Sequence, residues 1–252
     1  PEMLFALGLD EQIVGVTEFC DFPAAAKAKS KVGYANPNLE SLVALRPELI
    51  IAPREFHRAN VLAKLEELKI PVLLLEATSV ENIFSHIHTL GRIFDRSTEA
   101  HAMTAAMRSR MAEISGRTEH LPRIRVLYVI NSQPLITVGP GSYIHQMIGL
   151  AGGTNIASGA ATPYPRLTME TVLKEDPEVL IFPMGPVETV PRREQQEWRR
   201  WTTLTAVQQN RLREVSANAL NRPGPRVMEG LEELVRVIHP EAFPPESAPV
   251  QP

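Results

Sequence analysis

The sequence predicts an α/β protein with two lobes of mainly parallel sheet, joined by one long α-helix and enclosing a ligand cleft. Three observations predict this fold: a sixteen-residue unit that occurs twice, apolar runs that alternate with helical segments, and a long uninterrupted helical pattern. The unit reads NLESLVALRPELIIAP over residues 38–53 and TMETVLKEDPEVLIFP over residues 168–183. The copies align without a gap, and an interval of this length indicates duplicated lobes rather than a solenoid of short repeats.

Each copy of the unit predicts a capped helix followed by a buried strand. Asn38 and Thr168 are residue types that cap helices, and a proline follows the helical stretch in both copies. The next four residues are LIIA in the first copy and VLIF in the second. Continuous apolar runs of this kind are typical of parallel strands buried on both faces.

The remaining elements extend this pattern to both halves of the chain. Further strands are expected over residues 13–17, 31–33, 72–76, 124–130, 134–139 and 213–215, and further helices over residues 2–8, 58–68, 142–153 and 192–200, with a last helix ending near residue 239. Strand, helix and strand in succession indicate right-handed βαβ crossovers.

A long helix is expected to connect the two halves. Apolar residues recur about every 3.6 residues over 80–115, and no proline interrupts them. We therefore expect an N-terminal α/β lobe over residues 1–93, a linking helix over 94–117, a C-terminal α/β lobe over 118–240 and a flexible, proline-rich tail over 241–252.

The composition is that of an ordinary globular chain of 252 residues, with 44% hydrophobic and 22% charged residues. The net charge of −3, with scattered Lys and Arg, does not favour nucleic acid as a partner. No apolar run approaches the roughly 20 residues that span a bilayer. A single cysteine excludes an internal disulfide and a cysteine-rich metal site. The chain opens directly on a helical pattern, so we expect its start to be trimmed, and the missing signal segment says nothing about export.

Two acids occupy matched positions in the repeated unit. Glu40 and Glu170 each lie in the first turn of a predicted helix. One interpretation is electrostatic: acids there complement the helix dipole, by about 0.3–1 kcal/mol each. The other is functional: each lobe offers one exposed carboxylate to a symmetric partner with paired arginines.

Several side chains lie on loops that follow predicted strands, where open parallel sheets bind ligands. The candidates for ligand contact are Cys20, Phe22, Tyr34, Tyr164, Arg166 and Arg222. The aromatic rings would line the cleft, and the arginines would hold carboxylate, amide or phosphate groups. The alternatives are local packing for the aromatic residues, small buried packing for the cysteine, and solvated surface charge for the arginines.

Other motifs are given structural interpretations. The seven histidines form no recognisable metal site, and no nucleophile motif or clustered acid pair indicates an enzyme. The segment VGPGSYIHQ lacks the spacing of a phosphate loop, so we expect a turn with Ser142 as helix cap. Trp198 and Trp201 are expected to pack within the lobe.

Four segments together resemble a known family. They read GVTEFCDFP, KVGYANPNLESLVALRPELIIA, SYIHQMIGLAGGTNIA and YPRLTMETVLKEDPEVLIF, and they cover nearly the whole chain in order. They resemble the helical-backbone (class III) periplasmic substrate-binding proteins, which deliver cobalamin, iron-siderophores or haem to ABC importers. The resemblance is greatest to the cobalamin-binding branch.

The resemblance implies two α/β lobes joined by one long helix, with the ligand in the cleft. It also implies that Glu40 and Glu170 dock onto arginines of the membrane subunits. The cleft positions of the cobalamin-binding branch fall here on Phe22, Tyr34, Tyr164 and the loop around Asn218 and Arg222. A cobalamin-binding protein of the family carries tryptophan where this chain has Tyr34, Tyr164 and Pro53.

The expected function is therefore capture without catalysis. The chain would act outside the cytoplasm as a monomer, free in the periplasm or lipid-anchored, and carry a corrinoid to the membrane subunits of an ABC importer. A ferric siderophore or haem is the alternative ligand. No intrinsic cofactor or metal site is expected, because the metal would arrive inside the ligand. An enzyme on a similar fold, as in nitrogenase-like components, would need several cysteines, and a binder of a free metal ion would need three or four converging ligands.

Overall fold

A computed structural model describes residues 1–34, 37–54, 59–185 and 190–243 of the chain. The chain divides into two compact units: one comprises Pro1–Ala77 and Glu81–Thr104, and the other comprises Thr78–Val80 and Ala105–Pro252. Both units combine helices with mainly parallel strands, so the predicted fold class is confirmed. Of the tail expected over residues 241–252, residues 244–252 lie outside the described residues.

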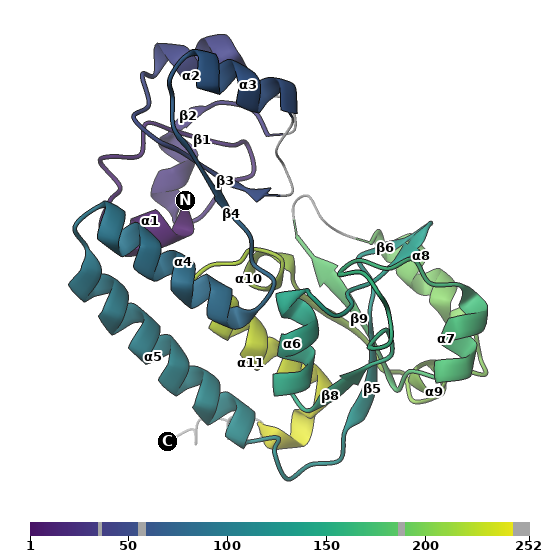
Figure 1. Cartoon of the computed structure of the whole chain (residues 1–252). Helices are drawn as coiled ribbons and strands as arrows, with labels where there is room; N and C mark the ends of the chain where they lie inside the picture. Colours follow the sequence, from purple (N-terminus) through teal and green to yellow (C-terminus); the bar gives the residue numbers. More distant parts are fainter. Residues whose placement is uncertain (35–36, 55–58, 186–189, 244–252) are drawn as a thin grey trace, which may run out of the picture. The chain divides into compact units, whose positions relative to one another are not determined.

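The first unit contains two pairs of parallel strands and the helices that follow them (Figure 1). Its elements are α1 (Glu2–Ala6), β1 (Gly15–Val16), the 3₁₀ helix η1 (Ala24–Ala28), β2 (Ser30–Lys31), α2 (Leu39–Ala44), β3 (Ile50–Pro53), α3 (Ala59–Glu67), β4 (Val72–Leu75), nearly all of α4 (Val80–Ile93) and the start of α5 (Ser97–Gly116). β1 pairs with β2, and β3 pairs with β4, each in parallel.

The second unit is built on a four-stranded parallel sheet in the order β10-β9-β5-β8. Its elements after α5 are β5 (Ile124–Tyr128), β6 (Asn131–Ser132), β7 (Leu135–Ile136), α6 (Tyr143–Leu150), β8 (Gly153–Asn155), α7 (Met169–Glu175), β9 (Val179–Met184), α8 (Arg192–Glu197), the 3₁₀ helix η3 (Trp198–Arg200), α9 (Thr205–Gln208), β10 (Leu212–Ser216), α10 (Ala217–Leu220), α11 (Val227–Ile238) and the 3₁₀ helix η4 (Pro240–Ala242). Helices α7, α8 and α9 lie on one side of this sheet, and α6 and α11 lie on the other (Figure 1).

The strand β9 of the second unit's sheet is buried on both faces, as its apolar run predicts. Val179, Leu180, Ile181 and Phe182 of β9 are all fully buried. On the side of α7–α9, the core includes the ring of Trp198, whose centroid lies 6.3 Å from that of Phe182. Trp201 packs against the same cluster, which confirms the structural interpretation of both tryptophans.

The two copies of the repeated unit begin with the same cap. The side chain of Asn38 accepts a hydrogen bond from the backbone N–H of Ser41 at 3.0 Å. In the second copy Thr168 Oγ1 accepts from the N–H of Thr171 at 3.2 Å. Each bond satisfies one of the donors that a helix leaves unpaired in its first turn.

The two helices of the repeat also end in the same way. Arg46 has φ 49° and Asp176 has φ 43°, so both copies leave the helix through a left-handed residue immediately before the shared proline. The proline cannot continue the helix, and the chain turns directly into the buried strand. The duplication is therefore present in the backbone as well as in the sequence.

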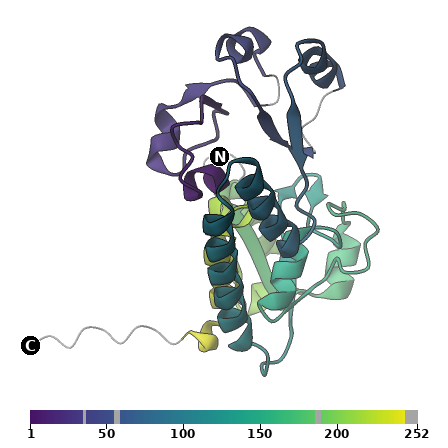
Figure 2. The same ribbon diagram turned by 60° about the vertical axis from the view of Figure 1, so that its left-hand side comes forward.

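The long helical pattern is interrupted once. The long helix expected over residues 94–117 is present as α5 (Ser97–Gly116), and it begins three residues later than expected because α4 ends at Ile93 and Asp95 has φ 54°. α4 turns back into α5 as a helical hairpin, which the two views in Figures 1 and 2 show. Gly91 permits the tight turn, because a Cβ there would lie 2.6 Å from the Cβ of Ala100. The boundary between the two units falls inside α5.

Three other expectations are corrected. The strand expected over residues 134–139 is the short β7 of an antiparallel hairpin with β6, because Pro134 precedes it and the chain turns there. β8 follows α6 directly through Gly152, where only a helix end was expected, and Gly152 adopts φ 80°. α10 occupies residues 217–220, where a loop was expected.

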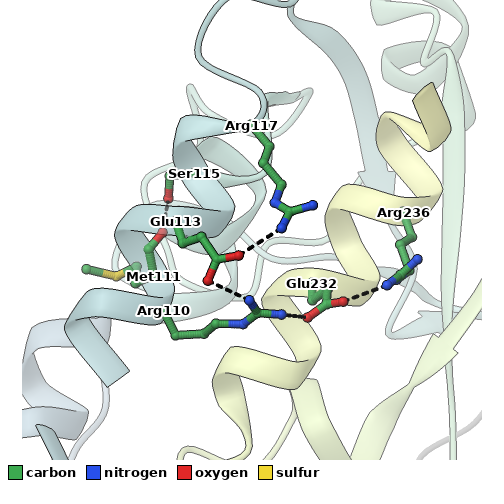
Figure 3. Close-up of polar contacts among 7 residues, drawn as sticks. All are labelled: Arg110, Met111, Glu113, Ser115, Arg117, Glu232 and Arg236. Atoms are coloured by element: carbon green, nitrogen blue, oxygen red, sulfur yellow. Dashed lines mark hydrogen bonds and ion pairs between the residues drawn. The ribbon is translucent and has the colours of Figure 1, made fainter. Parts of the chain in front are cut away.

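An ionic network joins α5 to α11 within the second unit (Figure 3). Arg110 contacts both Glu113 of its own helix and Glu232 of α11. Arg117 donates to Glu113 at 2.8 Å, and Arg236 donates to Glu232 at 2.7 Å. The guanidinium groups of Arg117 and Arg236 lie over the Phe243 ring, at 4.4 and 4.3 Å from its centroid, so this ring contacts both ends of the network.

The network depresses the pKa of Glu232. Burial by itself would raise this pKa, but the hydrogen bonds from Arg236 and Arg110 lower it by more, so the net pKa lies below the ordinary glutamate value. A carboxyl group with a lowered folded-state pKa stabilises the fold above the ordinary pKa. That contribution is lost as the pH falls through the folded-state value.

We predict that Glu232→Gln destabilises the second unit by about 1 kcal/mol at neutral pH. The difference from the wild type should shrink as the pH falls below the ordinary glutamate pKa and on through the lower folded-state pKa of Glu232, where the native carboxylate becomes protonated. Urea unfolding followed by tryptophan fluorescence measures this directly, since both tryptophans belong to the second unit. Glu229→Gln, an exposed position on the same helix, is the matched control and should show no comparable pH-dependent loss. Equal stability of the two variants at pH 7 would contradict the role of the network.

Candidate ligand-binding and docking surfaces

In the first unit, predicted ligand contacts follow the strands β1 and β2. These strands are parallel, so the segments after them leave from the same edge. Cys20 and Phe22 lie on the first segment and Tyr34 lies on the second. Phe22 is exposed to 43%, whereas Cys20 is half-buried and its Sγ lies 3.1 Å from Thr17 Oγ1.

The structure adds an aromatic residue that the sequence analysis missed. The ring of Phe19 meets that of Tyr34 edge to face, with centroids 4.8 Å apart and planes at 80°. The packing interpretation therefore holds for one side of the Tyr34 ring, which is half-buried. Phe19 lies in the same short motif as Cys20 and Phe22. Its closeness to these two candidates in the sequence was the signal that could have identified it as a further candidate.

In the second unit, Tyr164 and Arg166 lie on an extended segment hydrogen-bonded to the chain around β7. Pro163 accepts from the N–H of Gly139 at 2.8 Å, and Pro165 accepts from the N–H of Thr137 at 3.1 Å. Alternate residues of an extended segment point to the same side. Tyr164 and Arg166 are both exposed, Tyr164 to 47%, while Pro165 between them is half-buried. The ring and the guanidinium thus belong to one face of this segment.

Asn218 and Arg222 lie just beyond the carboxyl end of β10, and both are half-buried. Asn218 is on α10 rather than on the expected loop, because the side chain of Ser216 caps that helix through the N–H of Ala219 at 3.3 Å. Asn221 fixes the following turn to the end of β5 by accepting a 2.7 Å hydrogen bond from the Tyr128 hydroxyl. The sequence signal for α10 was a serine followed by four residues without glycine or proline.

The candidates of the second unit share one edge of its sheet. β5, β9 and β10 are parallel, with Ser216 in register with Met184. Thr137 Oγ1 donates to the carbonyl oxygen of Tyr128 at 2.6 Å, which ties the hairpin beside Tyr164 to the carboxyl end of β5. One exposed aromatic ring, an amide and two guanidinium groups therefore gather around the edge where open parallel sheets bind ligands.

His145 has a structural role. Its Nδ1 accepts a hydrogen bond from the Asn155 side chain at 3.0 Å, and burial lowers its pKa below the ordinary histidine value. The imidazole is therefore neutral at pH 7 and holds α6 to the end of β8. Within the described residues no group of three or more His, Cys, Asp or Glu side chains is arranged to hold a metal ion.

The two acids predicted to dock onto a partner are both exposed. Glu40 lies in the first turn of α2 and Glu170 in the first turn of α7. Their positions near the helix starts also complement the helix dipoles, so the electrostatic interpretation applies to both. Exposure leaves each carboxylate accessible to a second molecule.

The chain matches the model of a family described as periplasmic binding protein over residues 1–219. A vitamin B12-binding protein from Vibrio parahaemolyticus is 26% identical over 235 residues, covering 92% of this chain and 84% of the relative. An uncharacterised ABC transporter substrate-binding lipoprotein from Bacillus subtilis is 26% identical over 250 residues, covering 96% and 78%.

A solved structure extends the comparison to the backbone. The periplasmic heme-binding protein from Pseudomonas aeruginosa superposes with a TM-score of 0.85 at 26% identity, covering 98% of this chain and 91% of that one. These relatives are named for binding, in agreement with the expectation of a binding protein rather than an enzyme. No helix within the described residues is long and apolar enough to cross a membrane.

We predict that Gly139→Ala disturbs the segment that carries Tyr164. A Cβ at Gly139 would lie 2.6 Å from the carbonyl oxygen of Thr162 and 3.1 Å from Cδ of Pro165. Because the carbonyl oxygen belongs to the backbone, the segment must shift, at a cost of about 1–3 kcal/mol. Urea unfolding followed by tryptophan fluorescence measures this loss. Gly159→Ala is the control, since a Cβ there meets no atom within 4 Å; equal stability of the two variants would refute the close contact.

Proposed function

We propose, since this chain belongs to the periplasmic binding protein family, that it is the extracytoplasmic solute-binding component of an ABC importer and that its ligand is a corrinoid. The proposal includes capture of the ligand by side chains of both units and its delivery to the membrane permease. One observation carries the choice of a large planar ligand. Each unit exposes an aromatic ring beyond the carboxyl ends of its strands, Phe22 in the first and Tyr164 in the second.

The exposed rings supply the apolar part of the affinity. An aromatic side chain offers 150–250 Å² of surface, so rings exposed to 43% and 47% have roughly 80–100 Å² each left to bury. At about 25 cal/mol per Å² this amounts to about 2 kcal/mol for each ring, before the costs of association. Tyr34, half-buried against Phe19, would add a further edge in the first unit.

The polar groups of the second unit supply orientation. Asn218, Arg166 and Arg222 would hydrogen-bond the amide side chains at the rim of a corrin ring. Cys20 is assigned a minor contact beside Phe22, since its Sγ already lies against Thr17. The metal would arrive inside the ligand, so we propose no resident cofactor and no protein-ligated metal.

Haem is the second candidate ligand. Arg166 and Arg222 are suited to pair with carboxylates such as those of haem. The relative with a solved structure is named as a heme-binding protein, and its identity to this chain equals that of the vitamin B12-binding relative. A ferric siderophore is the remaining alternative within the family.

We predict that cyanocobalamin binds with one molecule per chain, and more tightly than haemin or a ferric hydroxamate. Isothermal titration and absorbance titration measure the three affinities. Phe22→Ala and Tyr164→Ala should each weaken binding about 10- to 30-fold, in keeping with about 2 kcal/mol for each ring. Leu68→Ala, at a residue exposed to 41%, is the control and should leave affinity unchanged.

If haemin binds more tightly than cyanocobalamin, the corrinoid is rejected as the ligand and haem, the second candidate, takes its place. Loss of affinity in only one of the two aromatic variants would reject a ligand held by both units. Sedimentation of the complex tests the accompanying proposal that the chain acts as a monomer. The Bacillus relative is named as a lipoprotein, so the proposed location outside the cytoplasm includes a lipid-anchored form.

We predict that Glu40→Arg together with Glu170→Arg abolishes uptake of the ligand and leaves ligand affinity intact. Reversed charges would repel the arginines that the docking proposal places on the permease. Uptake into proteoliposomes that contain the permease and ATPase of the same importer measures the first effect, and titration measures the second. Glu48→Arg with Glu229→Arg reverses the charge of one other exposed acid in each unit, changes the net charge by the same amount, and is the control. Unchanged uptake in the Glu40/Glu170 variant would dismiss the docking assignment.

A further inference from the structure

The two helices that carry the candidate docking acids are exposed in the same way. Residues 39–45 and residues 169–175 show the same order of burial: half-buried, exposed, half-buried, buried, two exposed positions and half-buried again. The caps and the left-handed ends of these helices also match. The two copies therefore present equivalent outer faces, although their sequences differ at most positions.

A large apolar side chain lies on the outer face of each helix. Val43 of α2 is exposed to 39% and Leu173 of α7 to 38%. Each follows its glutamate by three residues, the spacing that places two side chains next to each other on a helix surface. The glutamate and the apolar residue thus form one small surface, Glu40 with Val43 in the first unit and Glu170 with Leu173 in the second.

A single exposed apolar residue is ordinary on a protein surface and needs no explanation. Two exposed apolar residues at equivalent positions of a duplicated unit do need one. The described residues contain seven exposed large hydrophobic side chains: Val14, Phe22, Val43, Leu68, Ile93, Tyr164 and Leu173. Two of them fall on the same position of the duplicated unit. The next exposed position carries Ala44 in one copy and Lys174 in the other, so the outer faces are not alike at every position. Both copies are therefore apolar three residues after the acid, whereas at the next position the second copy carries a charge.

We infer that Val43 and Leu173 are part of the surface that docks onto the permease. The inference rests on the proposed function and names the chemistry of the partner. That partner has two equivalent sites, each with a cation beside an apolar depression. A two-fold symmetric membrane dimer offers such a pair of sites, because a symmetry axis repeats every surface once. The carboxylates would steer the encounter, and the apolar side chains would lose water on contact.

The test uses variants of similar shape that make the side chain polar, Val43→Thr and Leu173→Asn. The permease–ATPase complex of the same importer, held in lipid nanodiscs, is the binding partner, and biolayer interferometry measures affinity. Full burial of such a side chain changes an affinity by about tenfold to 150-fold, and these residues have about two fifths of their surface left to bury. Each variant should therefore weaken docking about threefold to fivefold, and the double variant about 10- to 25-fold if the sites act independently.

Two controls keep the result specific. The exchange Val43→Leu with Leu173→Val retains both apolar surfaces and should dock as well as the wild type. Leu68→Asn changes a similarly exposed residue outside the repeated unit and should have no effect on docking. Ligand affinity should stay at the wild-type value in all variants, and the melting temperature should show that each variant is folded at the temperature of the docking measurement, since about two fifths of each side chain is exposed.

The outcomes separate this inference from the docking role of the acids. If the double variant docks normally while the charge reversal at Glu40 and Glu170 prevents docking, the apolar contact is refuted and the acids keep their role. If neither change affects docking, both assignments fail. If the exchange variant docks as poorly as the double polar variant, docking depends on the shape of these side chains rather than on their apolar character. The inference is then overturned.

Discussion

Burial of β9 on both faces of the four-stranded parallel sheet is the constraint on which the second unit depends. With β9 fully enclosed, a ligand has no access to the faces of this strand, and side chains of mixed chemistry gather instead beyond the ends of the strands. Tyr164, Arg166, Asn218 and Arg222 all lie around the carboxyl ends of these strands. The same constraint keeps charged residues out of β9, which is why its apolar run could be recognised in the sequence.

The repeated unit was the most predictive part of the sequence because its signals are local and agree with one another. A capping residue, an apolar helical stretch, a proline and four apolar residues together leave few alternatives, and the structure contains the expected helix and strand in both copies. Asn38 and Thr168 cap as expected. The left-handed residue that joins helix to proline, Arg46 or Asp176, has no common side-chain signal, since the backbone rather than the residue type is shared.

The misses have a different physical origin. The break before α5 depends on Asp95 adopting a left-handed conformation. Aspartate tolerates this conformation, but an aspartate in the sequence does not by itself predict it. β8 is three residues long and exists because Gly153–Asn155 pairs with β5, a contact that sequence periodicity does not report. For the candidate site residues, parallel topology was enough to predict the edge of the sheet at which they lie. The contact of Phe19 with Tyr34 could not, because it joins segments that follow different strands.

One consequence of α5 concerns how the chain can be divided. The last point at which the chain passes from the first unit to the second lies between Thr104 and Ala105, inside a continuous helix, where each backbone N–H bonds to the carbonyl four residues before it. A fragment that stops at the boundary would leave four carbonyl groups without helical partners, and its complement would lose the matching donors. Recombinant halves would therefore need overlapping ends, and melting of one half would fray the helix that begins the other.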